Sequence, residues 1–425
     1  MTVAAVKLDN RYTDYVANVG WRNRWWIVAA SVIGLAVGQG SIMVFCFGIF
    51  LKPVSATLGL SRGTMSLGLL FAAAASALAT PVVGLLIDRH GNRIVMLPGI
   101  AMFALAVAAL STLQSSPLAL VYILLALAGL FGAVQTPIVY AALICKWFDR
   151  ERGLALGLAM AGVGLGALIV PQLAALAIRT CGWRTAYLIL SAMIFAFALV
   201  PVALFVREPS GLGRAERDHR DGRPSLPGLT IAHALTQSWR FWSLNAAFFI
   251  GGMSIQGTLA HVVAMLTDRG FGFQGAAAAF SSAGLAMIVG RVASGYSLDR
   301  FHGPSVAIGS FIAPAVGIAL LASGLSGPVP LLGILLCGLG VGAQIGLQPF
   351  FASRYFGLKS IGAISGVMFG SFLAGLGLGP YLSGVCFDTW HSYVPDLVAY
   401  AIVLAAASIL FVPLGPYPFA SRPGR

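Results

Sequence analysis

Twelve apolar runs, each long enough to cross a lipid bilayer, constrain the fold of this 425-residue chain more than any other feature. A membrane-spanning helix needs about 20 consecutive apolar residues. The runs occupy residues 25–50, 64–87, 94–113, 119–144, 153–178, 186–206, 241–266, 276–298, 306–325, 329–351, 362–386 and 397–414. With 58% hydrophobic and only 9% charged residues, the chain is too apolar for a water-soluble protein of this size. The sequence therefore predicts an all-helical integral membrane protein.

The longest polar connection separates the sixth run from the seventh and divides the runs into two groups of six. It covers residues 207–240 and is rich in glycine, proline and charged residues, which is typical of a flexible linker. The expected organisation is an N-terminal tail, a first six-helix bundle, a linker, a second six-helix bundle and a C-terminal tail. These parts are assigned to residues 1–24, 25–206, 207–240, 241–414 and 415–425.

The two groups of runs also resemble each other in sequence. Gly84 and the Asp88-Arg89 pair, at the end of the second run, return as Gly295 and the Asp299-Arg300 pair about 210 residues later. A glycine and proline pattern in the fifth run returns in the eleventh at a nearly equal offset. The repeat predicts two bundles related by a parallel duplication, with the substrate held between them at mid-depth.

The distribution of positive charge predicts the orientation. Placing the N-terminus inside the cell puts most of the 26 lysine and arginine residues in cytoplasmic segments, as the positive-inside rule requires. We therefore expect both termini in the cytoplasm and a multi-pass protein of the inner membrane. The formal charge of +13 then reflects topology and contact with anionic lipid, and no nucleic-acid partner is needed.

Neither a metal site nor a cofactor site is predicted. The five cysteines are scattered, lie mostly within apolar runs and form no CxxC pair, so they are expected to pack as small apolar residues. No glycine-rich loop follows a strand in the manner of a nucleotide site. We expect no catalytic activity and no process driven by nucleotide hydrolysis.

One polar motif resembles a known family. Residues 84–93 read Gly-x-x-x-Asp-Arg-x-Gly-x-Arg, which is similar to the signature between the second and third helices of the major facilitator superfamily. Residues 47–52, 146–155 and 354–357 resemble the branch that contains monocarboxylate transporters and oxalate/formate antiporters. The resemblance covers essentially the whole chain and implies the superfamily fold, two six-helix bundles related by a pseudo-two-fold axis.

The motif and its repeat supply candidates for a cytoplasmic gate. Charged pairs at cytoplasmic helix ends can hold the two halves together when the cavity faces outward. Charge that only sets topology is the alternative, and it explains the arginines but not the paired aspartates. The candidate gate residues are Gly84, Asp88, Arg89, Gly91, Arg93, Gly295, Asp299 and Arg300.

Arg291 is the main candidate for substrate binding. It is a single cation within run 276–298, in a chain whose apolar runs contain no Asp or Glu. A lone intramembrane charge costs several kcal/mol and marks a functional site by default, and a guanidinium binds a carboxylate with two parallel hydrogen bonds. The alternative is that Arg291 snorkels to the cytoplasm. The resemblance favours the first interpretation, because carriers of this branch anchor a carboxylate with an arginine of the eighth span.

The chain departs from its relatives where a proton or a second charge would bind. Met287 occupies the position of an acidic residue in animal monocarboxylate transporters, and Phe45 lies near the position of a first-span lysine. Oxalate/formate antiporters carry a second cation in the eleventh span, but run 362–386 has no Lys, Arg or His. One positive centre predicts a substrate with one carboxylate.

His261 is the other ionisable candidate within a run. The resemblance implies that it faces the central cavity, where it would contact the substrate. Because imidazole titrates near neutral pH and the runs contain no acidic residue, His261 is also the candidate to carry a coupling proton. Ordinary packing with a hydrogen-bonded neighbour is the alternative. Further polar and aromatic candidates for the cavity wall are Tyr140, Gln344, Gln39, Asn245, Phe45 and Phe369. Helix-to-helix hydrogen bonding and packing are their alternatives.

The resulting hypothesis is a monomeric secondary transporter that moves a small monocarboxylate of lactate or pyruvate size by alternating access, coupled to a proton. Three alternatives remain open. They are organic-anion exchange without protons, transport of another small solute by the same fold, and a membrane sensor that binds a ligand without moving it.

Overall fold

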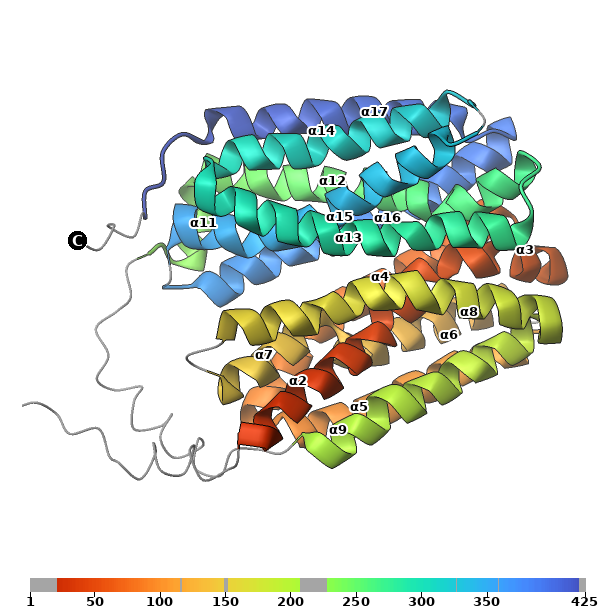
Figure 1. The fold of residues 1–425 in the computed structure, drawn as a ribbon, viewed down its shortest axis with the longest axis horizontal. Coiled ribbons are helices and arrows are strands. Elements are labelled where there is room, and N and C mark those ends of the chain that lie inside the picture. The colour runs from red at the N-terminus through yellow and green to blue at the C-terminus, as the bar shows by residue number, and fades with distance from the viewer. Residues whose placement is uncertain are drawn as a thin grey trace, which may run out of the picture.

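The computed structural model describes residues 21–114, 117–148, 152–206, 228–325, 327–357 and 359–419. Helices form nearly all regular structure in these ranges, and Gly228 and Gly357 make one isolated β-bridge. The helices run roughly parallel to one long axis and form two bundles, one on each side of a central interface (Figure 1). The expected all-helical fold with two bundles is confirmed.

The N-terminal bundle, lower in Figure 1, contains the elements of the first half of the chain. They are α2 (Trp21–Ala36), the π-helical turn η1 (Gly40–Phe45), α3 (Phe47–Leu58), α4 (Arg62–His90), α5 (Asn92–Ala109), α6 (Leu118–Gly132), α7 (Pro137–Trp147), α8 (Arg152–Ile194) and α9 (Val200–Phe205). The C-terminal bundle consists of α12 (Trp239–Asp268), α13 (Phe273–Arg300), α14 (Gly303–Ala322), α15 (Val329–Phe356), α16 (Ile361–Trp390) and α17 (Val394–Ala407).

Eleven helical stretches of the described residues are long and apolar enough to cross a membrane. One of them, Leu154–Phe205, has 52 residues and is twice the length that a bilayer needs. It is divided by Gly182, whose φ of 80° and ψ of 161° are not helical. Glycine adopts this positive φ without steric cost, so the chain reverses there and the stretch makes two crossings, as the twelve apolar runs predicted.

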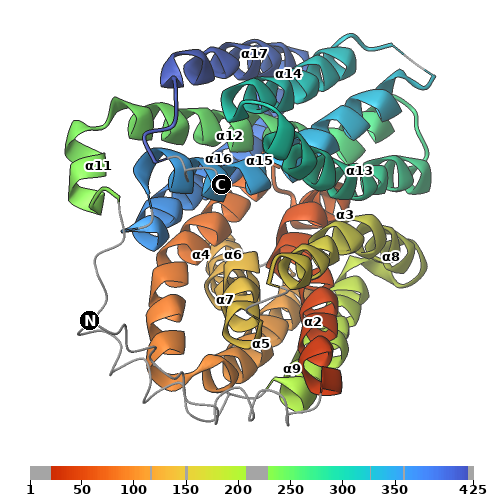
Figure 2. The same ribbon diagram turned by 60° about the vertical axis from the view of Figure 1, so that its left-hand side comes forward.

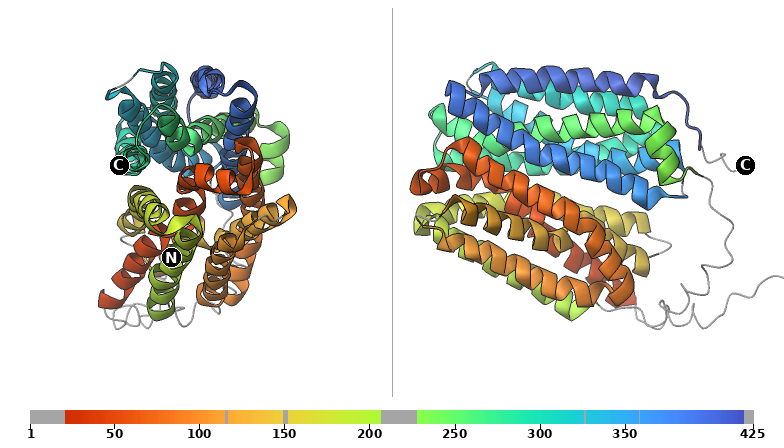
Figure 3. Two further views of the ribbon diagram at one scale, coloured as in Figure 1. Left: turned by 90° about the vertical axis from the view of Figure 1, so that its right-hand side faces the viewer. Right: turned by 180° about the vertical axis from the view of Figure 1, so that it is seen from behind.

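The two ends of the molecule are distinguished by their connections. The linker end is where α9 stops and α12 starts, and the far end is where α3 leads into α4; Figure 2 and Figure 3 show both from other directions. The described last part of the expected linker, 207–240, is partly helical. The helix α11 (Ile231–Gln237) begins at Thr230, whose hydroxyl accepts from the backbone N–H of His233.

Contacts at glycine show that the two bundles meet towards the far end. A Cβ on Gly384 of α16 would lie 2.6 Å from the Cα of Gly63 on α4. A Cβ on Gly284 of α13 would lie 2.4 Å from the backbone nitrogen of Leu168 on α8. Nearer the linker end, an added Cβ would meet no atom within 4 Å at four glycines of these helices, Gly84, Gly157, Gly295 and Gly366. The interface is therefore closed at the far end and opens towards the linker end.

Within the C-terminal bundle, glycine lets α16 pack directly on the backbone of α12. A Cβ on Gly375 would lie 2.1 Å from the carbonyl oxygen of Phe249, whereas one on Gly370 of the same helix would meet nothing within 4 Å. Small residues at such crossings are typical of membrane helices, because close backbone approach supplies the packing energy.

Replacing Gly375 with alanine should therefore destabilise the protein by about 1–3 kcal/mol, because the two helices must separate to admit the methyl group. The same change at Gly370 is the matched control and should leave the melting temperature unchanged or slightly higher. Thermal unfolding of the detergent-purified variants measures both. Equal melting temperatures would show that the α12–α16 contact is not tight.

The expectation that no carboxylate lies within a span is wrong. Asp388 lies in the span Ala363–Trp390, Asp396 begins the span Val394–Leu414, and Asp268 ends the span Trp239–Asp268. The apolar runs stop short of these residues, but the helices extend by about one turn at the far end, where Asp268 and Asp388 accept hydrogen bonds from the other bundle. Apolar run length therefore underestimated helix length.

Candidate functional site

A cavity of 120 Å³ lies between the two bundles and is lined by both of them. Its wall is almost entirely apolar, and among the described residues no charged side chain lines it. Four lining residues have polar side chains, Gln39, Ser76, Thr136 and Gln256. The volume is below the range of about 300–1,000 Å³ that is usual for drug-sized ligands, so the cavity suits a small solute.

Three of the predicted lining residues meet in this cavity. Gln39 accepts a hydrogen bond of 3.0 Å from the hydroxyl of Ser76 through Oε1. Phe45, which ends η1, and Phe369 of α16 form parts of the apolar wall from opposite bundles. The π-helical turn is what breaks the expected first run, and its last residue is the cavity-lining phenylalanine.

Two other candidates lie outside the lining and are satisfied or packed within one bundle. The Tyr140 hydroxyl donates to Oε1 of Gln135 at 2.9 Å and packs against Gly34. Asn245 donates to the Phe241 carbonyl and accepts from Ser371. These geometries match the packing alternative for both residues.

Gln344 is also absent from the lining, but its environment differs. Its amide is completely buried directly behind Gly251, a cavity-lining residue on α12, and neither amide atom has a hydrogen-bond partner among the described residues. A polar group in this state costs about 1–3 kcal/mol. The absence of a side chain at Gly251 is what leaves room for the amide there.

Arg291 lies on α13 one turn beyond Met287, which lines the cavity. Its Nη1 donates a hydrogen bond of 2.7 Å to the backbone carbonyl of Met160 on α8, so the guanidinium joins the two bundles. Its Nε is buried and has no partner among the described residues. The guanidinium therefore lies at the interface of the bundles beside the cavity, which the snorkelling alternative does not predict.

No carboxylate of the described residues forms an ion pair with Arg291. A guanidinium that keeps one carbonyl contact and a buried free N–H retains unused capacity for an anion. Among the described residues Arg291 has no acidic partner, and in this conformation its guanidinium contacts a backbone carbonyl and does not line the cavity.

His261 is not where the resemblance placed it. It lies towards the far end of α12, is only 2% exposed and does not line the cavity. Its Nε2 lies 2.9 Å from the Pro380 carbonyl and 3.1 Å from the Ser66 hydroxyl, and its Nδ1 lies 3.0 Å from the Tyr393 hydroxyl. Because Ser66 belongs to α4 and Pro380 to α16, the imidazole is enclosed by both bundles.

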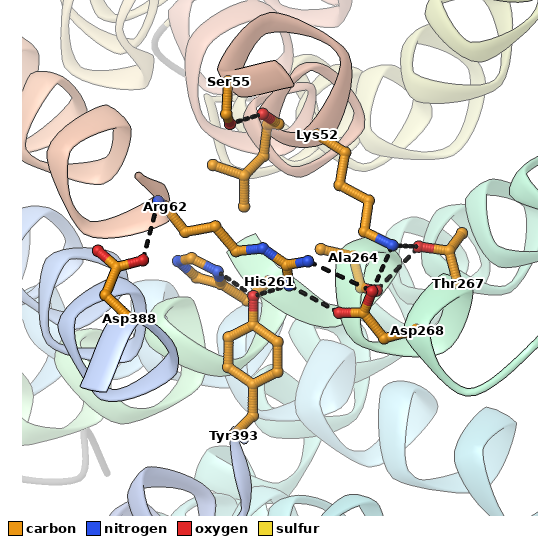
Figure 4. A network of polar contacts seen from close by, with 10 residues as sticks. Lys52, Ser55, Arg62, His261, Ala264, Thr267, Asp268, Asp388 and Tyr393 are labelled. Carbon is orange, nitrogen blue, oxygen red and sulfur yellow. Dashed lines mark hydrogen bonds and ion pairs between the residues drawn. The ribbon is translucent and has the colours of Figure 1, made fainter. Parts of the chain in front are cut away.

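Directly beside His261, the far end is closed by a network of charges that we call the latch: Lys52, Arg62, Asp268, Asp388 and Tyr393 (Figure 4). Asp268, from the C-terminal bundle, pairs with Lys52 at 2.5 Å and with both Nη atoms of Arg62 at 2.7 and 3.3 Å. Arg62 Nη1 also donates to the Tyr393 hydroxyl at 2.6 Å. Every one of these bonds joins one bundle to the other.

Asp388 adds a second type of contact to the latch. Its carboxylate accepts hydrogen bonds from the backbone N–H groups of Arg62 at 3.1 Å and Gly63 at 2.8 Å. These groups have no partner within α4, and the helix dipole favours a negative charge at this end. One bundle therefore caps a helix of the other, while the Arg62 guanidinium stacks 3.7 Å from the Phe387 ring.

The latch was missed in the sequence because its residues are far apart in the chain and lie in short connections. In the expected topology, Lys52 and Arg62 belong to the few positive charges outside the cytoplasm, and no partner for them is predicted. One signal was present. Lys52, Arg62 and Asp268 all lie in connections expected on the same side of the membrane, where they could pair.

The predicted gate at the linker end is only partly described. The side chains of Asp88 and Asp299 lie outside the described residues, so the proposed pairs stay a prediction. Gly91 has a φ of 88° and turns the chain between α4 and α5. Arg93 donates to the Ala203 carbonyl at 2.9 Å, and Arg300 stacks over Tyr296. Gly84 and Gly295 face open space, as described above.

Comparison with known proteins places the chain among transporters. The family model described as Major Facilitator Superfamily matches residues 33–380. An uncharacterised MFS-type transporter, YcxA, of Bacillus subtilis (strain 168) is 25% identical over 92% of this chain and 93% of its own. Monocarboxylate transporter 11 of Mus musculus is 27% identical over 93% of this chain and 88% of its own.

A solved structure has the same fold. It is a bacterial homologue of the human lysosomal transporter Spinster, in an inward-facing and unoccupied conformation. Its TM-score is 0.69 at 17% identity, and the match covers 94% of this chain and all of that one. At this identity the likeness shows the fold alone.

Proposed function

Because the chain belongs to the major facilitator superfamily, we propose that it is a secondary transporter that moves a small monocarboxylate between its two bundles by alternating access. Lactate and pyruvate have the expected size. The chain contributes an apolar cavity of 120 Å³ for the short carbon skeleton and one cation for the carboxylate. No cofactor or metal takes part, and the protein works as a monomer in the lipid bilayer.

The observation that carries this proposal is the state of Arg291. It is a cation one turn from the cavity wall, with a buried free N–H and no ion pair to any described carboxylate. Charges at membrane depth are ordinarily paired, because solvation by lipid cannot replace water. An anionic substrate supplies the missing partner, and a single centre accounts for a single carboxylate.

The same geometry supports an inward-open conformation as part of this proposal. Positive charge favours the linker end as the cytoplasmic side, so the space between the bundles opens inward and the latch closes the outer side. Substrate released from the cavity passes towards the linker end. Outward opening requires the latch to break and the linker-end pairs to form.

We propose that His261 carries the coupling proton. It is the imidazole enclosed by both bundles, and imidazole titrates near neutral pH. The alternative is exchange of organic anions without protons. It is favoured by Met287, which stands where animal monocarboxylate transporters have an acidic residue. A different small solute remains compatible with the fold, and a sensor without flux is the remaining alternative.

Uptake by proteoliposomes tests the proposal directly. With purified protein, labelled lactate or pyruvate should accumulate when the outside is acidic, and uptake should fall severalfold when an ionophore collapses the pH gradient. Proton-independent exchange predicts instead that the ionophore does not change uptake and that uptake requires an anion inside the proteoliposomes. Absence of flux for any short carboxylate, together with substrate-induced thermal stabilisation, would select the sensor.

A further inference from the structure

The contacts of His261 define how its hydrogen atoms are arranged in the closed latch. The Pro380 carbonyl can only accept, so Nε2 carries the hydrogen and donates to it at 2.9 Å. Nδ1 of the neutral imidazole then has a free lone pair, and the Tyr393 hydroxyl donates to it at 3.0 Å. The partners of the two nitrogens thus assign the tautomer.

Tyr393 transmits this arrangement to the latch. Its oxygen accepts from Nη1 of Arg62 at 2.6 Å while its only hydrogen goes to His261. Burial raises the pKa of the Tyr393 hydroxyl, which therefore stays protonated and able to donate. A continuous, oriented chain of hydrogen bonds thus runs from the N-terminal bundle through Tyr393 to the imidazole.

A proton on Nδ1 is incompatible with that chain. Both Nδ1–H and the Arg62 guanidinium would then point at the one phenol oxygen, and the phenol hydrogen would lose its acceptor. The latch contains two cations and two carboxylates in contact, so an imidazolium adds an unbalanced positive charge in a buried place. Buried charges without a partner cost several kcal/mol.

The charged and titratable groups around His261 leave no alternative partner in contact with it among the described residues. Asp268 is held by Lys52 and Arg62, Asp388 is held by the start of α4, and Asp396 of α17 lies against Ser383 and Cys386. Tyr400 of α17 packs against Gly257, one turn away on α12, and donates to the Gly379 carbonyl. Ser66 supplies only a hydroxyl, on the Nε2 side.

From this geometry we propose that His261 is a proton-binding site and that its protonation is incompatible with the closed latch. Acidification therefore opens the far end of the transporter. Opening admits water to the imidazolium, and closing requires the proton to leave. Ser66, which contacts Nε2, lies one turn before the cavity-lining Leu69 on α4. The inference rests on the proposed function and deepens its proton coupling, because it names the step at which the proton acts.

The test measures the distance across the far end in the absence of substrate. It can therefore contradict the proposal for His261 even if carboxylate transport is confirmed. Spin labels are placed on the exposed natural Cys181 of the N-terminal bundle and on Gly272→Cys of the C-terminal bundle. A Cβ added at Gly272 would meet no atom within 4 Å. Cys145 is replaced by serine, and Cys46, Cys337 and Cys386 are buried.

Double electron–electron resonance should show one short distance between the two spin labels at pH 8. A population with a longer distance should grow as the pH falls to 5.5. For one proton, linkage limits the change in the open-to-closed ratio to about tenfold per pH unit. His261→Gln should abolish this dependence, because an amide still donates to Pro380 but cannot take a proton. Ser66→Ala, which leaves Nδ1 and Tyr393 intact, should keep it.

If His261→Gln fails to fold, Tyr393→Phe gives the same information. Loss of its hydroxyl should raise the open population already at pH 8 and flatten its pH dependence. A distance distribution in the parent protein that ignores pH would overturn the proposal. So would a pH response of equal size in His261→Gln, which would assign the proton to another group.

Discussion

Replacing Arg291 with alanine is expected to lower carboxylate transport by about a hundredfold or more while the protein folds normally. Removing one partner of a desolvated charged hydrogen bond costs about 2–5 kcal/mol, and a substrate carboxylate held by a guanidinium fork forms such a pair. The loss should appear as a lower transport rate per unit substrate concentration, measured as initial uptake of labelled lactate or pyruvate by proteoliposomes at equal protein content.

Stability separates this role from a structural one. In the substrate-free structure Arg291 makes one hydrogen bond, to the Met160 carbonyl, and leaves Nε buried without a partner among the described residues. Deleting a partly unsatisfied charge removes a desolvation cost together with that bond. The melting temperature of Arg291→Ala should therefore equal or exceed that of the parent, and a substrate-induced rise in melting temperature should vanish.

Two matched variants sharpen the interpretation. Arg291→Lys keeps the charge but loses the planar fork, so it should retain part of the transport rate. Arg184→Ala removes another guanidinium that bonds a backbone carbonyl, that of Leu113, within the N-terminal bundle. It should leave transport near the parental rate. Saturable transport by Arg291→Ala at the parental rate would show that Arg291 does not bind the substrate.

The sequence predicted the parts of the fold that depend on local composition. Apolar run length identified every crossing, including the two that Gly182 separates, because the bilayer imposes a minimum length on each helix. It did not identify the helix ends. Asp268 and Asp388 extend helices beyond the apolar runs because partners from the other bundle satisfy them, and such partners are invisible in a single sequence.

The sequence predicted how deep each candidate residue lies in the membrane. It did not predict which way the side chain points around the helix axis, and therefore which residues line the cavity. Gln39, Phe45 and Phe369 line the cavity as expected, but Tyr140 and Asn245 point into their own bundle at similar depth. His261 was expected at the cavity and lies at the latch. When both faces of a helix are apolar, the pattern of its side chains does not reveal which face meets the other bundle.

Replacing Asp268 with asparagine is expected to open the far end and shift the closed-to-open ratio by about tenfold. Among the described carboxylates only Asp268 pairs with both Lys52 and Arg62, so losing its charge leaves two cations of the N-terminal bundle facing a neutral amide. The Asp268 and Lys52 side chains are each 33% exposed, and that of Arg62 is 15% exposed. The effect should thus lie between the ~0–1 kcal/mol of a surface pair and the ~3–5 kcal/mol of a broken buried pair.

The reactivity of a cysteine at position 66 can measure opening of the far end. Ser66 is completely buried beneath the latch, in contact with His261, and becomes accessible only when the latch opens. In a background where the exposed Cys181 is replaced by serine, a cysteine at Ser66 should react slowly with a bulky, membrane-impermeant maleimide. Adding Asp268→Asn should raise its labelling rate by about tenfold, as expected when the reaction requires the open state and labelling follows its population. Asp388→Asn should have a smaller effect, since an amide oxygen still accepts from the backbone of α4. Unchanged labelling in Asp268→Asn would mean that glycine packing between α4 and α16, rather than the charges, holds the far end closed.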